Sequence, residues 1–434
     1  MIYLPEIEGA AGDPEALEAA YQDARRDKQE AAFREALETC YQDAPANLLY
    51  AAWHVRLRET GQPRDRAVNW VLAVPLSVAL GLLFGLLFDQ RLELPGRVPY
   101  LILGWAPIAT AFVLAFLALA SRKSIKRAAL AAAGLLVVLL YVTTFVAFRE
   151  RAHYTLLMIL HLPLLAWIGC GLYLLGQRSE PRERFAFVIQ SIEVFVTAGL
   201  FVGAGGAFGL ITVGMFEALG ISLPVTVVQR LFAAGGGLIP VLAVASGYDP
   251  RSGPDASRLR QGLSKIIATL MRLMLPMTLL VLAVYLVAIP FNFLEPFYNR
   301  ETLIVYNVML FAVIGLLVGA TPVQETDLAE KHHRILRAGI LVVAVLATLV
   351  SLYALSATVY RTVTMGGWTV NRVAVIGWNA INVGLLVLLV VKQLQAGADR
   401  WLDAAQTVFG WGMRAYAAWA TFLVLAIPLL FGER

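Results

Sequence analysis

Four ionisable residues lie inside long apolar stretches of the sequence: Glu193, Glu217, Arg230 and Arg272. A charge at membrane depth is costly and generally faces a partner or a water-filled cavity. Glu193 and Arg272 lie at similar depths from the same end of their stretches, whereas Glu217 and Arg230 flank the far end of a hairpin. The spacing predicts two acid–base pairs, Glu193 with Arg272 and Glu217 with Arg230. Either the pairs fix helix packing, with Arg230 able to snorkel to the interface, or they serve transport or a proton relay.

Other polar residues within the apolar stretches extend this candidate intramembrane site. Gln190 lies three residues before Glu193, so a helix places both on one face. His161 lies in the segment MILHLPLL and is interpreted either as a packed core histidine or as a proton carrier. Three asparagines are predicted to make hydrogen bonds between helices: Asn307, Asn379 and Asn382.

Glycine is concentrated in two neighbouring apolar stretches, and the first of them, from Phe185 to Gly220, is longer than one membrane crossing requires. One interpretation is close helix packing through small residues. The other is a pair of broken helices whose exposed backbone lines a substrate or ion site. The candidate helix-breaking residues are Gly203, Gly205, Gly206, Gly235, Gly236, Gly237 and Pro240.

The sequence contains no recognisable catalytic or metal-binding motif. GxSxG, HExxH and Walker A patterns are absent. Cys40 and Cys170 lie in different regions without metal or redox spacing, and the pair His332-His333 lies in a polar loop where solvation is expected. We therefore assign no catalytic, cofactor-binding or metal-binding residue and favour a non-enzymatic protein. The missing P-loop argues against self-powered ATP-driven transport but not against a membrane subunit of a larger machine.

The composition places the chain in a membrane. Of its 434 residues, 59% are hydrophobic and 15% are charged, and the mean hydropathy is +0.70. Soluble proteins are about 45–50% apolar and about 25% charged. This balance excludes a disordered chain, a disulfide scaffold and a nucleic-acid binder, and predicts an all-α polytopic transmembrane helical bundle. Eleven spans are expected: 68–88, 98–120, 128–147, 154–175, 185–215, 224–245, 266–289, 302–320, 338–359, 373–391 and 414–431.

The connections between these spans carry an alternating charge. The net charge is +5, and Lys and Arg are concentrated in every second connection, beginning with the flank before the first span. Basic connections lie in the cytoplasm, so the N-terminus is predicted inside and the C-terminus outside. The first residues lack the basic and apolar regions of a cleaved signal peptide. Residues 393–413 are predicted to form an amphipathic helix in the plane of the membrane interface.

Residues 1–66 are polar with a helical pattern, whereas residues 67–434 form the transmembrane domain. Asp13-Pro14 is a helix start, a second helix is expected over 29–42, and Pro45 is expected to open a third. The second helix carries one apolar face, formed by Ala32, Phe33, Ala36, Leu37 and Cys40. The segment AAFREALETCYQDAPANLLYAAW resembles part of a tetratricopeptide repeat, although about three repeats are needed for stability. Residues 1–66 are therefore interpreted as a helical bundle against the membrane or as a partner-binding module.

Three segments in the last two-thirds of the chain have a sequence pattern that resembles a known group of proteins. They are RTVTMGGWTVNRVAVIGWNAINVGLL (361–386), VASGYDPRSGPDASRLRQGLSKIIATLMRLMLP (244–276) and PFNFLEPFYNR (290–300). In these segments the chain resembles uncharacterised bacterial multi-pass membrane proteins of the DUF4153-like type. The resemblance implies a bacterial inner-membrane protein, and it implies no activity or functional residue.

Three functions remain open from the sequence. The leading hypothesis is a non-enzymatic protein that binds or translocates a small molecule, ion or lipid, with the four ionisable residues lining or gating its interior. The alternative is a membrane scaffold or assembly subunit that recruits a cytoplasmic partner through residues 1–66. The third is a lipid-active membrane enzyme. The expected partners are the lipid bilayer, a cytoplasmic protein, and further copies or other subunits in an oligomer.

Reporter fusions test the predicted orientation. We expect a fusion at residue 434 to report the outside of the membrane, because the basic connections alternate with the other ones through eleven crossings. A cytoplasmic signal at that position would contradict the topology.

Overall fold

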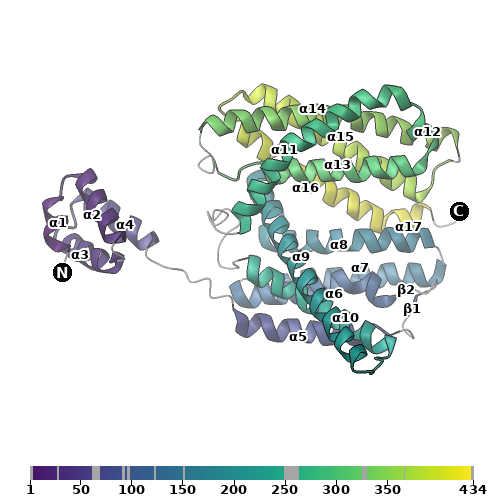
Figure 1. Ribbon diagram of the computed structural model, residues 1–434, viewed down its shortest axis with the longest axis horizontal. Coiled ribbons are helices and arrows are strands. Elements are labelled where there is room, and N and C mark those ends of the chain that lie inside the picture. The colour runs from purple at the N-terminus through teal and green to yellow at the C-terminus, as the bar shows by residue number, and fades with distance from the viewer. Residues whose placement is uncertain are drawn as a thin grey trace. The chain divides into compact units, whose positions relative to one another are not determined.

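The computed structural model folds into two compact units, Met1–Ala67 and Val68–Arg434 (Figure 1). Both units consist almost entirely of helices, as the sequence predicts. The residues that the structure describes are 3–26, 29–60, 69–89, 93–94, 98–121, 124–149, 152–248, 263–324, 330–365 and 367–431.

The N-terminal unit contains four helices: α1 (Leu4–Gly9), α2 (Pro14–Arg26), α3 (Glu30–Asp43) and α4 (Leu48–Thr60). Asp13 caps α2 as predicted, because its Oδ1 accepts hydrogen bonds from the backbone N–H groups of Glu15 and Ala16 at 3.0 and 3.1 Å. The prediction that Pro45 opens the next helix is wrong. Asn47 is the cap of α4, and its Oδ1 accepts a hydrogen bond from the backbone N–H of Leu49 at 2.9 Å. An asparagine side chain can accept this bond from a free N–H group at the helix start, whereas a proline side chain has no acceptor.

The N-terminal unit has its own apolar core. The predicted face of α3 is buried at Phe33, Leu37 and Cys40, and α1, α2 and α4 cover it. Trp53 packs against Phe33 with ring centroids 6.1 Å apart, and the Arg56 guanidinium lies 4.2 Å from the Trp53 ring centroid. Arg56 also pairs with Glu18, and this hydrogen-bonded partner lowers the pKa of the Glu18 carboxyl. The helices before α3 therefore bury a face that a single repeat would leave open.

The second unit carries eleven helices that are long and apolar enough to cross a membrane, counted over the described residues, which is the number predicted. They are α5 (Trp70–Leu87), α6 (Tyr100–Ser121), α7 (Ile125–Arg149), α8 (Ala152–Leu175), α9 (Pro181–Ala218), α10 (Val225–Gly247), α11 (Leu263–Ala288), α13 (Arg300–Ala320), α14 (Glu330–Thr364), α15 (Val370–Ala396) and α16 (Trp401–Leu425). Short elements join or end them: antiparallel strands β1 (Glu93–Leu94) and β2 (Val98–Pro99), a 3-10 helix η2 (Ile289–Asn292), α12 (Glu295–Tyr298) and α17 (Ile427–Leu430).

The eleven helices pack in three apolar clusters. One joins α5, α6 and α10 with the neighbouring ends of α7 and α8. A second joins the α6–α8 group to α15, α16 and α17. The third gathers the start of α9 with α11 and α13 to α16. Consequently α9 and α16 connect the group formed by α5 to α8 and α10 with the group formed by α11 and α13 to α15, as the ribbon shows (Figure 1).

The last span begins earlier than the sequence suggests. Residues 393–413 do not form an interfacial helix, because α15 continues to Ala396 and α16 begins at Trp401. The polar residues that suggested an interface have partners inside the unit. Gln406 is buried and its Nε2 donates to the carbonyl oxygens of Pro322 and Val323 at 3.0 and 2.9 Å. Hydrogen bonding of this kind allows a polar residue to be buried without the penalty of an unmade bond.

The predicted helix breaks do not occur. Helix α9 is continuous through Gly203, Gly205 and Gly206, and α10 is continuous through the 235–237 glycines and Pro240. Lipid offers no partner to an opened backbone, so an uninterrupted helix is the favourable state even for a glycine-rich segment.

Close packing through glycine is found at Gly237. A Cβ atom placed there would lie 2.8 Å from the Gly81 Cα and 2.9 Å from the Leu80 carbonyl oxygen, so the backbones of α10 and α5 are in direct contact. Among the described residues, no atom beyond the adjoining residues and the helix's own backbone lies within 4 Å of such a Cβ at Gly203, Gly205, Gly206, Gly235 or Gly236. Most of the glycines therefore lie on open surface.

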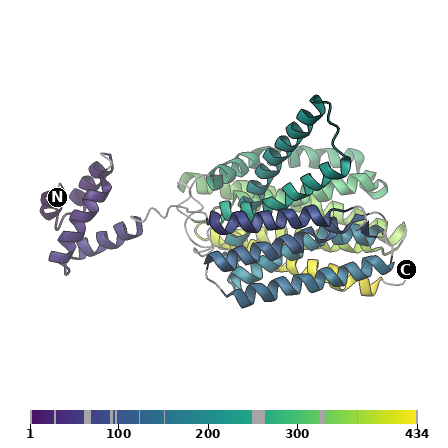
Figure 2. The same cartoon turned by 90° about the horizontal axis from the view of Figure 1, so that it is seen from below.

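The distal half of α9 is the least covered part of the unit. Its start is buried at Arg184, Phe185 and Glu193, whereas Phe208 is 73% exposed. Figure 2 shows the turn between α9 and α10 projecting from the remaining helices. This apolar surface is left to face lipid.

Two neighbouring glycines provide a test of the α5–α10 contact. We expect Gly237→Ala to destabilise the protein by about 1–3 kcal/mol, because an added methyl group forces apart two packed backbones. Gly236→Ala is the matched control and should keep or slightly raise the stability, since its methyl group meets open space and Ala favours a helix more than Gly does. Thermal unfolding of the two purified variants in detergent measures the difference. Equal stabilities would contradict the contact.

Candidate functional site

Glu193 is a carboxylate inside a membrane-spanning helix. Its exposed fraction is 9%, and it lies in the part of α9 that packs against other helices. Gln190 lies one turn earlier, and its Oε1 is buried without a hydrogen-bond partner among the described residues. Thr197 donates its hydroxyl to the Glu193 backbone carbonyl at 2.8 Å. A carboxylate and an amide oxygen are therefore buried on the same face of α9.

Arg272 lies on α11, which packs against both α9 and α13. Its Nε donates to the carbonyl oxygen of Ala320 at 3.1 Å, at the C-terminus of α13. The carbonyl groups at a helix C-terminus carry partial negative charge and favour a cation. The pairing of Glu193 with Arg272 stays a prediction.

The predicted pair of Glu217 with Arg230 is wrong. Arg230 forms an ion pair with Asp89, Nη2 to Oδ2, at 2.8 Å. Glu217 is exposed near the end of α9. The reason is the packing of α10 along α5, which brings Arg230 to the residues that follow α5. Sequence reasoning missed Asp89 because it lies just beyond the apolar stretch.

Helix α15 is the centre of a polar network inside the apolar region. Trp378 Nε1 donates to His161 Nε2 on α8 at 3.0 Å, while His161 Nδ1 lies 2.7 Å from the Leu157 carbonyl oxygen. The imidazole thus accepts at one nitrogen and donates at the other, as a neutral ring does. Both ring nitrogens have partners, which favours the interpretation of a packed core histidine.

Two asparagines extend the network to further helices. Asn379 Nδ2 donates to Asn307 Oδ1 on α13 at 2.8 Å, and the Tyr416 hydroxyl on α16 donates to Asn382 Oδ1 at 2.6 Å. The predicted bonds between helices are confirmed. Tyr416 and Trp378 were missed by sequence reasoning, although a buried Tyr or Trp generally needs a hydrogen-bond partner. Asn379 Oδ1 and Asn382 Nδ2 remain buried without a partner in the described part of the chain.

The buried side chain of Arg184 holds the start of α9. Arg184 is 3% exposed, and its Nε donates to the Gly410 carbonyl oxygen on α16 at 2.8 Å. Its Nη1 donates to the backbone carbonyl of Ser179. A Cβ at Gly410 would collide with the Pro181 carbonyl oxygen, so only glycine permits this approach.

The described residues define an integral membrane protein with a helical bundle of eleven candidate spans, and its spans contact the lipid bilayer. Comparison of the chain with protein-family models, curated protein sequences and solved structures finds no match in any of the three. The DUF4153-like and tetratricopeptide resemblances therefore stay predictions. Among the described residues, no group of three or more His, Cys, Asp and Glu side chains could hold a metal ion.

A double-mutant cycle tests the contact between α13 and α15. Replacing Asn307 and Asn379 by Ala, singly and together, should give a coupling energy of about 0.6 kcal/mol, as found for hydrogen bonds between membrane helices. Thermal unfolding in detergent supplies the four stabilities. The cycle of Asn307 with Asn382 is the control and should show no coupling, since Asn382 bonds to Tyr416 instead. Additive Asn307 and Asn379 effects would contradict the bond.

Proposed function

We propose that this protein binds or translocates a small cation, or a small solute that donates hydrogen bonds, within a bacterial inner membrane. The observation that supports this most strongly is Glu193, a carboxylate 9% exposed in a membrane-spanning helix. An ionisable residue at such a position is costly to keep, and it most often marks the path of an ion or substrate.

The chemistry of the Glu193 surroundings favours a positively charged or donating ligand. The Glu193 carboxylate and the Gln190 amide oxygen Oε1 are hydrogen-bond acceptors by type, and both belong to one face of α9. Oxygen atoms of this kind suit hard cations. Glu217 and Arg230 have no part in this proposal, because both are exposed and Arg230 pairs with Asp89.

A second candidate function rests on the N-terminal unit. Its four helices enclose their own buried core, so this unit can present a surface without help from the membrane helices. That property suits a scaffold that recruits a cytoplasmic partner, with the N-terminus in the cytoplasm.

Flux measurements with reconstituted protein test the leading proposal. We expect proteoliposomes that hold the full chain to pass protons or Na⁺, measured with an entrapped pH dye and with ²²Na⁺. Glu193→Gln should lower the flux by about tenfold or more, which corresponds to about 1.4 kcal/mol, because it removes the charge that attracts the cation. Glu217→Gln is the control, an exposed acid on the same helix, and should leave the flux unchanged.

The same assay separates the two functions. A chain without residues 1–67 should retain its flux if the membrane helices bind and move the solute. If the protein is a scaffold, no flux is measured for either chain, and the truncated chain loses its cytoplasmic partner in co-purification. A Glu193→Gln variant as active as the unaltered protein would contradict the leading proposal.

A further inference from the structure

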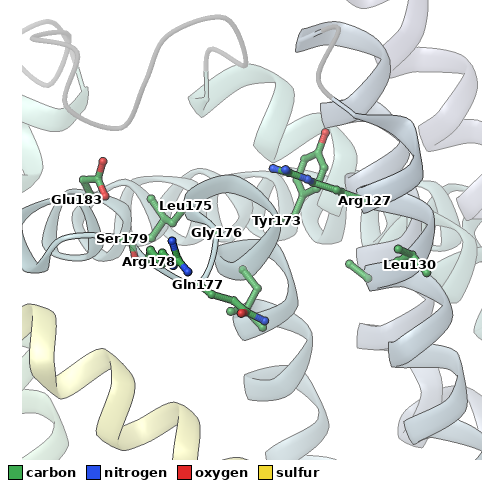
Figure 3. A pocket seen from close by; sticks show the side chains of 11 residues that line it. Arg127, Leu130, Tyr173, Leu175, Gly176, Gln177, Arg178, Ser179 and Glu183 are labelled. Atoms are coloured by element: carbon green, nitrogen blue, oxygen red, sulfur yellow. The ribbon is translucent and has the colours of Figure 1, made fainter.

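A pocket of about 690 Å³ lies where the start of α7, the end of α8 and the start of α9 meet (Figure 3). Gly176 ends α8 with a φ of +74°, a conformation that suits glycine, and the chain then turns into the short connection to α9. Arg414 on α16 donates to the carbonyl oxygens of Gln177 and Ser179 and so holds this connection in place. The pocket therefore lies at the ends of three helices, with a fixed turn as one wall.

The polar side of the pocket is basic. Arg127 on α7 and Arg178 in the α8–α9 connection both line it, as Figure 3 shows, and no described side chain pairs with either guanidinium. The lining also includes one carboxylate, Glu183. Its Oε2 accepts a hydrogen bond from the Glu180 backbone N–H at 2.8 Å as part of the cap of α9. Two guanidinium groups thus face a space whose single acid is already hydrogen-bonded.

The other side of the pocket is apolar and opens toward lipid. Leu130 follows Arg127 by one helical turn and is 64% exposed, and Leu172 on α8 is 53% exposed. The exposed surface continues along α7 past Gly134, where a Cβ would meet no neighbour, to Val137. A ligand in this pocket therefore meets cations at the helix ends and hydrocarbon surface along the helix axis.

We infer that this pocket binds an anionic phospholipid, with its phosphate at Arg127 and Arg178 and an acyl chain along Leu130 and Leu172. Guanidinium groups bind phosphate oxygens through paired, charge-assisted hydrogen bonds. Basic pockets between membrane helices on the cytoplasmic side are suited to acidic lipid headgroups, and the α6–α7 and α8–α9 connections are the ones predicted to be cytoplasmic. This site involves none of the residues of the proposed ion or solute path, so either proposal can fail without the other.

Native mass spectrometry of the full chain in detergent tests the lipid site. The probes are palmitoyl-oleoyl phosphatidylglycerol and the phosphatidylcholine with the same acyl chains. We expect tighter binding of phosphatidylglycerol. Arg127→Gln combined with Arg178→Gln should weaken that binding by about 30-fold, the equivalent of about 2 kcal/mol for two basic groups near the membrane surface. Arg300→Gln is the matched control, an exposed arginine at the opposite end of the helices, and should change nothing.

Two further measurements distinguish a lipid from a free phosphate. Leu172→Trp fills the apolar side without changing the charge, and it should weaken phosphatidylglycerol binding as well. Leu172→Trp also tests the lipid site if the double arginine variant does not fold. Inorganic phosphate at millimolar concentration should not displace the lipid. Displacement by phosphate, equal binding of the two lipids, or unchanged binding in both pocket variants would each overturn the proposal.

Discussion

The buried guanidinium of Arg184 holds the start of α9, and the positions of Glu193 and of the pocket beside Arg178 depend on it. Through the Gly410 carbonyl it ties α9 to α16, and through Ser179 it ties α9 to the connection from α8. An arginine can be buried in this way only when its donors are satisfied, because an unpaired buried charge is strongly unfavourable. The depth of Glu193 follows from this anchoring, and so does the wall of the pocket beside Arg178.

A second anchoring group lies at α15, which bonds to a different helix through each of three neighbouring side chains. Trp378, Asn379 and Asn382 reach α8, α13 and α16 respectively. Each bond is modest, about 0.6 kcal/mol, but together they favour one rotation of α15 about its own axis. Apolar packing alone would leave that rotation less well determined, since lipid tails are as apolar as the leucine side chains that they would replace.

The sequence predicts those features that depend on local pattern. Hydropathy identifies eleven spans, because each span requires about 20 apolar residues in a row, and the Asp13 cap follows from the residue type alone. Two of the errors concern partners that are distant in the chain. In the sequence Gln406 resembles an interfacial residue, but the fold places the carbonyl groups of Pro322 and Val323 within hydrogen-bond distance of it. Arg230 pairs with Asp89 because α10 packs along α5. The glycines of α9 and α10 gave no signal of which would be covered, since only Gly237 contacts the backbone of another helix among those predicted to break one.

The 38 residues of α9 have a consequence for how the protein responds to its membrane. At 1.5 Å per residue the helix is about 57 Å long, nearly twice the hydrocarbon thickness of about 30 Å. Because its start is held by Arg184, the distal half is the part of α9 that is free to absorb the hydrophobic mismatch, and tilting is one of the ways in which a long helix does so. A thicker bilayer would favour a steeper α9 and a thinner one a flatter α9. A change in bilayer thickness thus acts directly on the α9–α10 hairpin. Because Gly237 of α10 is in backbone contact with α5, the change also reaches α5.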